Sequence, residues 1–472
     1  MNIQQLSQGI LLGKWTSEEL TKHALKAIAD NDQSGKNLNS IAEINGDALF
    51  IARAMDKEIR EKGLRSPLHG IPVILKDNID VKGMHSTAGS FALNDLYCDK
   101  DSFLARKLRE AGAVIIAKAN LSEFAYWMSS QGMPSGYSSR NGQVNHAYQP
   151  GFDVSGSSSG SAVAVSARFI PISIGTETDG SIMSPSIANA IVAIKPTVGL
   201  VSRDGILPIS HVQDTAGPMA NNVSDVAYLL TAIAGKDEND AATHNIQIKN
   251  YIKALTRGIK NTRAGIITFK NQEVSDNCRK AYDNLRSLLR NNGCETVEIE
   301  YEDVILDDYP LLKYEFKNDL ERYLASHNSK LKLLSEIIQF NKDNTERCLK
   351  HGQDILEESD KVTGQLIESE YLQKRLELDE KAHELIDGLM EKNNVDVLIY
   401  AANNVMTNCS AVSGCPSLCL PAIDQSGEPF EPVSYYLMAK AYEEDVLIQF
   451  ASVIEKEISV KCKPEWVKEK YW

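Results

Sequence analysis

Short apolar runs of strand length alternate along the chain with longer segments of helical periodicity. Residues 114–116, 191–194, 265–269 and 395–400 form four of these apolar runs. Such alternation is typical of an α/β layer architecture, in which helices pack on a sheet. No Pro/Ser/Gly-rich linker, internal repeat or low-complexity run marks a boundary. The pattern therefore predicts one large α/β domain over residues 1–472.

Amphipathic helical patterns dominate residues from about 275 to 392, for example between Leu372 and Met390. We expect a mostly helical excursion over the sheet there, which either walls a substrate pocket or has a packing role alone. Near the N-terminus, Thr16 and Glu19 have the spacing of a capping box, in which each side chain accepts a hydrogen bond from the other residue's main-chain N–H group. This spacing predicts a helix start and carries no chemistry.

Two Gly/Ser-rich turns contain serines that are candidate catalytic residues. Ser157 lies in the turn at 155–161, and Ser181 follows 24 residues later in the turn at 175–182, with an apolar run at 169–174 between them. The second turn thus opens at a strand end, where main-chain N–H groups can stay free to bind an oxyanion. Taken alone, such turns are usually structural. A phosphate-binding loop needs a Lys-Ser/Thr pair after its glycines, and residues 159–162 contain none.

A serine hydroxyl is a weak nucleophile until a base removes its proton. Neither turn contains a histidine, although His69 or His211 could fold back as the base of a Ser-His pair. The other candidate is Lys76, which directly follows the apolar run at 70–75. A lysine in that position usually keeps its ammonium group in water at the edge of a strand. The choice of base therefore depends on the wider pattern.

That wider pattern resembles the amidase signature family of serine hydrolases. The family's hallmarks are an apolar-Lys-Asp-Asn segment, a Gly/Ser turn and a Gly-Ser-Ile turn. They occur here at 70–78, 156–160 and 180–182, in the family's order and with its serine spacing. Residues 314–341 are similar to the peptide amidase branch of the family, which hydrolyses C-terminal carboxamides of peptides.

The resemblance implies a fold and a catalytic relay. The fold is a single large domain with a central mixed, twisted β-sheet covered by helices. Ser181 would be the nucleophile, Ser157 would take its proton, and neutral Lys76 would accept that proton in turn. For Lys76 to act as a base near neutral pH, burial must lower its pKa. The resemblance also implies a cis peptide bond before Ser157.

The resemblance further implies how the substrate is held. The main-chain N–H groups of Thr178, Asp179, Gly180 and Ser181 would form an oxyanion hole. The expected reaction is cofactor-free hydrolysis of a linear carboxamide through an acyl-enzyme, with peptide C-terminal amides as the favoured substrates.

Four positions depart from the family's commonest pattern, namely Ser159, Glu177, Asp179 and Met183. The first three also occur in the peptide amidase branch. Met183 stands where many members carry an arginine that could pair with a substrate carboxylate, so neutral carboxamides are favoured over glutamine.

Two alternatives stay open. One is a broad aliphatic or aryl amidase, and the other is the glutaminase subunit of a tRNA-dependent amidotransferase, which works only with partner chains.

The charge and hydropathy of the chain restrict the classes of partner that we expect it to bind. A formal net charge of −14 disfavours nucleic acid and anionic membrane, because both bind basic surfaces. No apolar run approaches the ~20 residues of a membrane span, and the first residues lack the pattern of a signal peptide. We therefore expect a cytoplasmic monomer or homodimer that acts on a small amide or a peptide amide.

The eight cysteines of the chain include no C-x-x-C pair. Cys409, Cys415 and Cys419 have no histidine close by in the sequence. Reduced core thiols are therefore favoured over a zinc site or a disulfide framework, and we expect neither a metal nor another cofactor.

Overall fold

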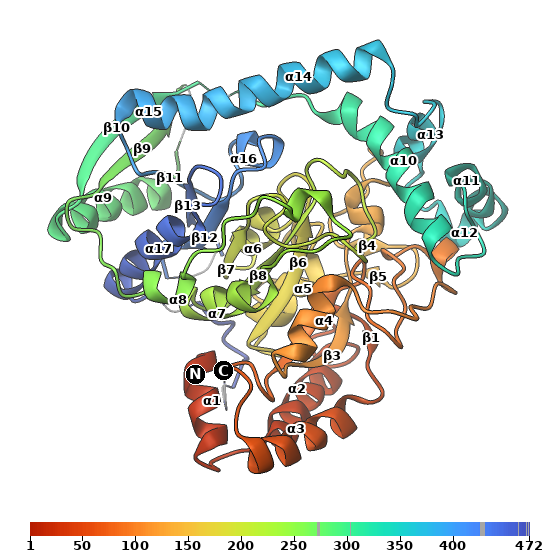
Figure 1. Ribbon diagram of the computed structural model, residues 1–472, viewed down its shortest axis with the longest axis horizontal. Helices are drawn as coiled ribbons and strands as arrows, with labels where there is room; N and C mark the ends of the chain where they lie inside the picture. Colours follow the sequence, from red (N-terminus) through yellow and green to blue (C-terminus); the bar gives the residue numbers. More distant parts are fainter. Residues whose placement is uncertain (271–273, 303, 425–429, 461, 469, 471) are drawn as a thin grey trace.

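One mixed sheet runs through the molecule (Figure 1), which a computed structural model describes for residues 1–472 apart from 271–273, 303, 425–429, 461, 469 and 471. Its eleven strands have the order β1-β3-β2-β6-β8-β7-β12-β13-β11-β9-β10. β2 is parallel to β3 and β6, and β9 is parallel to β10 and β11, whereas the other neighbours are antiparallel. The predicted single α/β domain with a central mixed sheet is confirmed.

The strands are short, and β4 and β5 form a separate two-stranded ribbon. Their bounds are β1 (Ile41–Ile44), β2 (Pro72–Lys76), β3 (Val114–Ala119), β4 (Tyr137–Ser138), β5 (Gly142–Gln143), β6 (Ile172–Glu177), β7 (Val192–Lys195), β8 (Thr215–Ala220), β9 (Arg263–Phe269), β10 (Glu295–Tyr301), β11 (Val397–Ala402), β12 (Ser417–Pro421) and β13 (Ser434–Met438).

Many strands of the sheet are buried, and the four predicted apolar runs all fall on strands. β2, β3, β6, β8 and β11 are buried along their whole length, as expected for strands covered on both faces. The run at 114–116 lies within β3, and the other three overlap β7, β9 and β11. All four predicted strands are confirmed.

Helices cover the sheet. α4, α7, α17 and α9 form a row in which each helix contacts the next, whereas α5 and α6 pack on β6, β7 and β12. The helix bounds are α1 (Ile3–Leu11), α2 (Ser17–Asn31), α3 (Ala48–Lys62), α4 (Phe103–Glu110), α5 (Ser159–Ser166), α6 (Met183–Ala188), α7 (Val223–Ile233), α8 (Tyr251–Ala254), α9 (Asp276–Asn291), α10 (Tyr309–Ser326), α11 (Leu334–Asp343), α12 (Thr345–Cys348), α13 (Asp354–Asp360), α14 (Ser369–His383), α15 (Leu389–Asn393), α16 (Cys409–Val412) and α17 (Glu444–Ile458).

The predicted capping box is present at the start of α2. Thr16 Oγ1 accepts a hydrogen bond from the Glu19 N–H group at 3.1 Å, and Glu19 Oε2 accepts one from the Thr16 N–H group at 2.8 Å. Two N–H groups that the first helical turn leaves free are thereby satisfied.

The segment at 275–392 combines helices with a strand. It contains α9 to α15, and it also contains β10, which extends the sheet as an edge strand parallel to β9. The sequence of β10 alternates between polar and apolar residues, as expected for a strand with one exposed face. From α10 onward the segment is helical, and α14 spans the top of the molecule in Figure 1.

Helices α10, α11 and α13 pack mainly through an apolar cluster that is separate from the sheet core, whereas α14 and α15 contribute buried residues to the sheet core itself. Phe316 of α10 contacts Phe124 edge-to-face, with ring centroids 6.0 Å apart. Trp127 lies beside Phe316 and Tyr309. These contacts join the helical segment to residues that follow β3.

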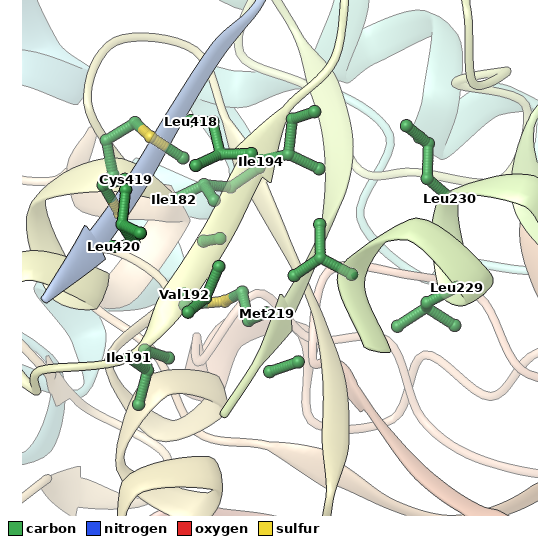
Figure 2. Close-up of a cluster of buried hydrophobic side chains, with 14 of the residues drawn as sticks. Ile182, Ile191, Val192, Ile194, Met219, Leu229, Leu230, Leu418, Cys419 and Leu420 are labelled. Carbon is green, nitrogen blue, oxygen red and sulfur yellow. The ribbon is translucent and has the colours of Figure 1, made fainter. Parts of the chain in front are cut away.

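Buried apolar side chains lie beneath the second serine turn. Ile182, the residue after Ser181, is completely buried with Ile194 of β7 and Leu418 of β12 (Figure 2). A Cβ atom added at Gly217 of β8 would lie 3.1 Å from Ile182 Cδ1. Ile182 therefore anchors the turn that carries Ser181 to the sheet.

Among the helices of the described residues, none combines the length and the hydropathy that a bilayer span requires.

Gly160, near the start of α5, allows close contact with the ends of β1 and β3. A Cβ atom added there would lie 2.3 Å from the main-chain oxygen of Ser40 and 2.4 Å from that of Asn120. Both are backbone atoms, so no side-chain rotation can relieve the clash.

We predict that Gly160→Ala lowers the free energy of unfolding by about 2–3 kcal/mol, because the backbone must shift to accept the methyl group. Chemical denaturation measures the effect. Gly46→Ala is the matched control, because Gly46 is exposed and its added Cβ meets nothing within 4 Å. The control should change stability by less than about 0.5 kcal/mol. Equal stability of the two variants would contradict the prediction.

Candidate active site

Lys76 is the last residue of β2, and its side chain is completely buried. The sheet order places it between β3 and β6. Its Nζ atom donates hydrogen bonds to Ser157 Oγ at 2.7 Å, to Thr176 Oγ1 at 2.9 Å and to the Thr176 main-chain oxygen at 3.1 Å. Three protein oxygens thus take the place of water around the amine.

Burial lowers the pKa of Lys76 from 10.5 to about 7, because the loss of hydration penalises the ammonium form. The carboxylates of Asp214 and Glu177 act in the opposite direction and offset part of this effect. The neutral amine is therefore well populated near neutral pH.

Ser157 is completely buried just before α5, and the peptide bond that joins it to Gly156 is cis, as the resemblance implies. Its main-chain oxygen accepts a hydrogen bond from the Ser122 N–H group at 3.1 Å. The N–H group of the next residue, Ser158, donates to the Ser181 main-chain oxygen at 3.2 Å. The backbone thereby ties the two serine turns directly to each other.

The turn that carries Ser181 leaves β6 and enters α6. In the described part of the chain, the main-chain N–H groups of Thr178, Asp179, Gly180 and Ser181 donate no hydrogen bond to another protein group. Gly180 has a positive φ of 74°, a conformation that glycine adopts without strain. The turn thus presents four consecutive free N–H groups, the arrangement that an anionic oxygen requires.

Glu177, the last residue of β6, holds this turn from the inside. Its Oε2 atom accepts hydrogen bonds from the N–H groups of Ile182 at 2.7 Å and Met183 at 3.0 Å. Glu177 and Met183 are both buried. The carboxylate thus engages the N–H groups that directly follow Ser181 and leaves the preceding four free.

Asp214 and Thr178 link the turn to the loop before β8. Thr178 Oγ1 donates to Asp214 Oδ1, and Asp214 Oδ2 accepts from the N–H groups of Ile209 at 2.8 Å and Ser210 at 2.9 Å. Burial raises the pKa of Asp214 to about 6. The bracing role of Asp214 has no chemical signature in the local sequence, because its partners become apparent only in the folded chain.

A second polar group surrounds Asp179, whose side chain is exposed beside Ser181. Asn408 Nδ2 donates to Asp179 Oδ2 at 3.1 Å, and Gln213 Nε2 donates both to Asp308 Oδ2 at 2.8 Å and to the Thr178 main-chain oxygen at 3.3 Å. Reduced hydration and the neighbouring Asp308 carboxylate raise the pKa of Asp179. Asp308 and Asn408 come from distant parts of the sequence, so only the fold brings them here.

The two residues after Lys76 are structural supports. Asp77 lies 3.5 Å from Lys118 Nζ and accepts a hydrogen bond from Thr87 Oγ1. Asn78 Nδ2 donates to Thr176 Oγ1 at 3.0 Å. Asn78 therefore fixes the same threonine hydroxyl that accepts a hydrogen bond from Lys76.

The two histidines considered as alternative bases are engaged elsewhere. His69 is completely buried and accepts a hydrogen bond from the Arg65 N–H group at 3.0 Å. His211 Nδ1 contacts Asp319 Oδ2 at 2.8 Å. Across the described residues, neither imidazole forms a hydrogen bond with Ser157 or Ser181, so the geometry favours Lys76 as the base.

Two cavities differ in their relation to the serine turns. A cavity of about 10 Å³ is lined by Thr176, Thr178 and Asp214. A much larger cavity of about 460 Å³ lies between α9 and the ends of β9 and β11, where Tyr282 and Met406 are among its lining residues. Neither Ser157 nor Ser181 lines the larger cavity, so its size does not make it the reaction site.

Comparison with known proteins gives a consistent result. The model of the family described as Amidase matches residues 19–408. A probable amidase of Arabidopsis thaliana is 34% identical over 469 residues, which cover 96% of this chain and 89% of the plant protein. A glutamyl-tRNA(Gln) amidotransferase subunit of Prochlorococcus marinus is 35% identical over 329 residues, which cover 68% of this chain and 66% of that protein.

Among solved structures, the peptide amidase of Stenotrophomonas maltophilia superimposes with a TM-score of 0.93. The two sequences are 37% identical, and the match covers 99% of each chain. The resemblance to the amidase signature family, and to its peptide amidase branch, is thereby confirmed. The chain belongs to the Amidase family and is an amide-hydrolysing enzyme whose fold closely matches that of a peptide amidase.

Proposed function

We propose that the chain hydrolyses linear carboxamides through a relay of Ser181, Ser157 and Lys76, with C-terminal amides of peptides as its favoured substrates. The contact of 2.7 Å between Lys76 Nζ and Ser157 Oγ carries this proposal. It joins an amine whose pKa is about 7 to a hydroxyl in the serine turn whose backbone is tied to Ser181. A base whose pKa lies near the working pH is effective in general acid–base catalysis.

In the first half of the reaction, Ser181 Oγ attacks the amide carbonyl carbon and forms a C–O bond. The Ser181 proton passes to Ser157 Oγ, while the Ser157 proton passes to neutral Lys76. When the tetrahedral intermediate collapses, the C–N bond breaks. The proton held by Lys76 then returns through Ser157 to the leaving nitrogen, so ammonia or an amine departs and the acyl group stays on Ser181.

In the second half, water attacks the acyl-enzyme and gives up a proton through the same relay. The ester C–O bond breaks, Ser181 regains its proton and the carboxylic acid is released. The free N–H groups at 178–181 stabilise the anionic oxygen in both halves. Each such donor contributes roughly a hundredfold in rate in other acyl-transfer enzymes.

The surroundings of Ser181 favour a neutral carboxamide. Met183 is completely buried and supplies no positive charge. Asp179 is exposed beside Ser181, and Asp308 influences its ionisation. Reduced hydration and Asp308 already raise the pKa of Asp179, so a substrate carboxylate would add a further negative charge where charge is disfavoured, whereas a peptide amide presents only neutral donors and acceptors. The structural match to a peptide amidase supports the same choice.

A second candidate function is that of a glutaminase subunit. Its support is the similarity to a glutamyl-tRNA(Gln) amidotransferase subunit over about two thirds of each chain. The helical segment from α10 onward and the acidic surroundings of Ser181 favour the peptide amide instead. A broad aliphatic or aryl amidase with the same relay is the third outcome that the test below distinguishes.

We predict that the purified chain releases ammonia from a blocked dipeptide amide faster than from glutamine or a simple aryl amide. Ser181→Ala should reduce this release by at least about a thousandfold, because the nucleophile is lost. Ser166→Ala is the matched control, since Ser166 is a buried serine at the far end of α5, and it should keep full activity. Release of ammonia only from small aliphatic or aryl amides would identify a broad amidase instead of a peptide amidase. Turnover of glutamine, or activity only with added partner chains, would favour the glutaminase function.

We further predict that kcat/KM rises about tenfold per pH unit below a pH of about 7 and levels off above it. The sign follows from the relay, because raising the pH through the pKa of Lys76 increases the fraction of neutral base. Lys76→Met should lose most of the activity, together with this dependence. Ser166→Ala should show the wild-type profile. A profile that is flat across this range, or an unchanged acid limb in Lys76→Met, would show that Lys76 is not the base.

A further inference from the structure

Three side chains of different chemistry converge outside the serine turns. His383, Asp387 and Cys415 each offer one ligand atom, and these atoms all lie within 4.8 Å of one another. His383 Nδ1 is 3.1 Å from Asp387 Oδ2. One nitrogen, one oxygen and one sulfur therefore surround a common point.

The fold explains why a histidine that lies 32 residues from Cys415 in the sequence meets it in space. His383 is the last residue of α14, and Asp387 lies in the π-helical turn Glu384–Gly388 that follows. Cys415 follows α16, after Gly414 with a φ of 70°. Both α14 and the π-helical turn pack against α16, which lies below α14 and α15 in Figure 1. π-Helical turns are rare and frequently occur at functional sites.

The donor set suits a borderline-soft divalent cation. Zn²⁺ binds thiolate, imidazole and carboxylate at about 2.0–2.3 Å, usually with tetrahedral geometry. Ligand atoms around a tetrahedral Zn²⁺ are therefore about 3.3–3.8 Å apart. The three ligand atoms lie within 4.8 Å of one another. Side-chain movements of about 1 Å would bring them to the distances of a Zn²⁺ site. Hard cations such as Mg²⁺ and Ca²⁺ prefer all-oxygen sites and fit this set poorly.

The burial pattern allows a cation to enter and disfavours a thiol nucleophile. The side chains of His383 and Asp387 are 40% and 35% exposed, whereas Cys415 is completely buried. An ion can thus arrive from the histidine and aspartate side and reach the thiol beneath, while a bulky substrate cannot approach the sulfur. Asp387 Oδ1 is itself buried and forms no hydrogen bond with the described residues, so it is free to turn toward an ion.

We propose that His383, Asp387 and Cys415 form a Zn²⁺ site with three protein ligands and a fourth position for water. Binding deprotonates the Cys415 thiol and releases its proton to the solvent. The bound ion then links α14 and the π-helical turn to the segment that leads into β12. The site contains no residue of the serine relay, so it acts as a fastening or regulatory site rather than as part of amide hydrolysis.

The first test uses Co²⁺ as a spectroscopic substitute for Zn²⁺ in the reduced, chelator-treated protein. We expect saturation at one Co²⁺ per chain, with a thiolate-to-cobalt charge-transfer band that added Zn²⁺ displaces. Cys415→Ser should abolish the band. His383→Gln and Asp387→Asn should each weaken binding by at least about tenfold, since even the loss of an outer-shell partner has an effect of that size. Because His383 and Asp387 are partly exposed, these two variants are expected to fold.

The matched controls are Cys294→Ser, a buried cysteine outside the cluster, and His351→Gln, a histidine outside it. Both should bind Co²⁺ as the wild type does. Zn²⁺ should also raise the midpoint of thermal unfolding of the wild type and the controls, by mass action on the folded state, and raise it much less in His383→Gln. The proposal is overturned if the wild type shows no stoichiometric binding. It is equally overturned if the three cluster variants bind as tightly as the controls, in which case the three side chains are only a hydrogen-bonded pair beside a core thiol.

Discussion

The burial of one amine at the end of β2 is the constraint on which the rest of the site depends. A lysine is stable there only because the oxygens of Ser157 and Thr176 replace its water, and because the charge can be lost at a pKa of about 7. Removing the Lys76 side chain leaves these groups without their donor. The hydrogen bonds that stabilise the buried amine at the end of β2 include the contact with Ser157 on which the proposed relay depends.

Sheet topology supplies the geometry around that amine. β2 and β6 are parallel neighbours, so Lys76 and Thr176 reach the same edge of the sheet. The turn that follows β6 carries Ser181 to this edge, where Glu177 and the fully buried Ile182 hold its backbone. Its four N–H groups at 178–181 form no hydrogen bond with the described residues, whereas Glu177 accepts from the two N–H groups that follow. A rigid backbone that presents preorganised donors is what stabilisation of an oxyanion requires.

Residues that follow β8 in the chain contribute side chains to the surroundings of Ser181. Asp308, at the start of α10, and Asn408, at the start of α16, both lie in the polar group around Asp179. The helical segment that begins with α10 thus reaches the serine turn directly, and α14 continues from it over α16. The proposed substrate preference and the proposed metal site therefore both involve residues that only the fold brings to the helical segment. Members of one fold family commonly differ in such pocket walls while they share the reaction centre.

The sequence alone determined the α/β class, four of the strands, the start of α2 and, through the family resemblance, the candidate residues Lys76, Ser157 and Ser181. These features depend on local patterns: apolar runs, the spacing of a capping box and Gly/Ser turns with a fixed separation. Only the tertiary structure decided that Lys76, rather than His69 or His211, contacts Ser157, the serine of the proposed relay. It also placed β10 inside a range whose sequence pattern predicts helices, brought Asn408 and the charge of Asp308 near Asp179, and brought His383 to Cys415. These contacts link residues far apart in the chain, so their energies arise from packing and burial in the folded state, which local sequence patterns do not encode.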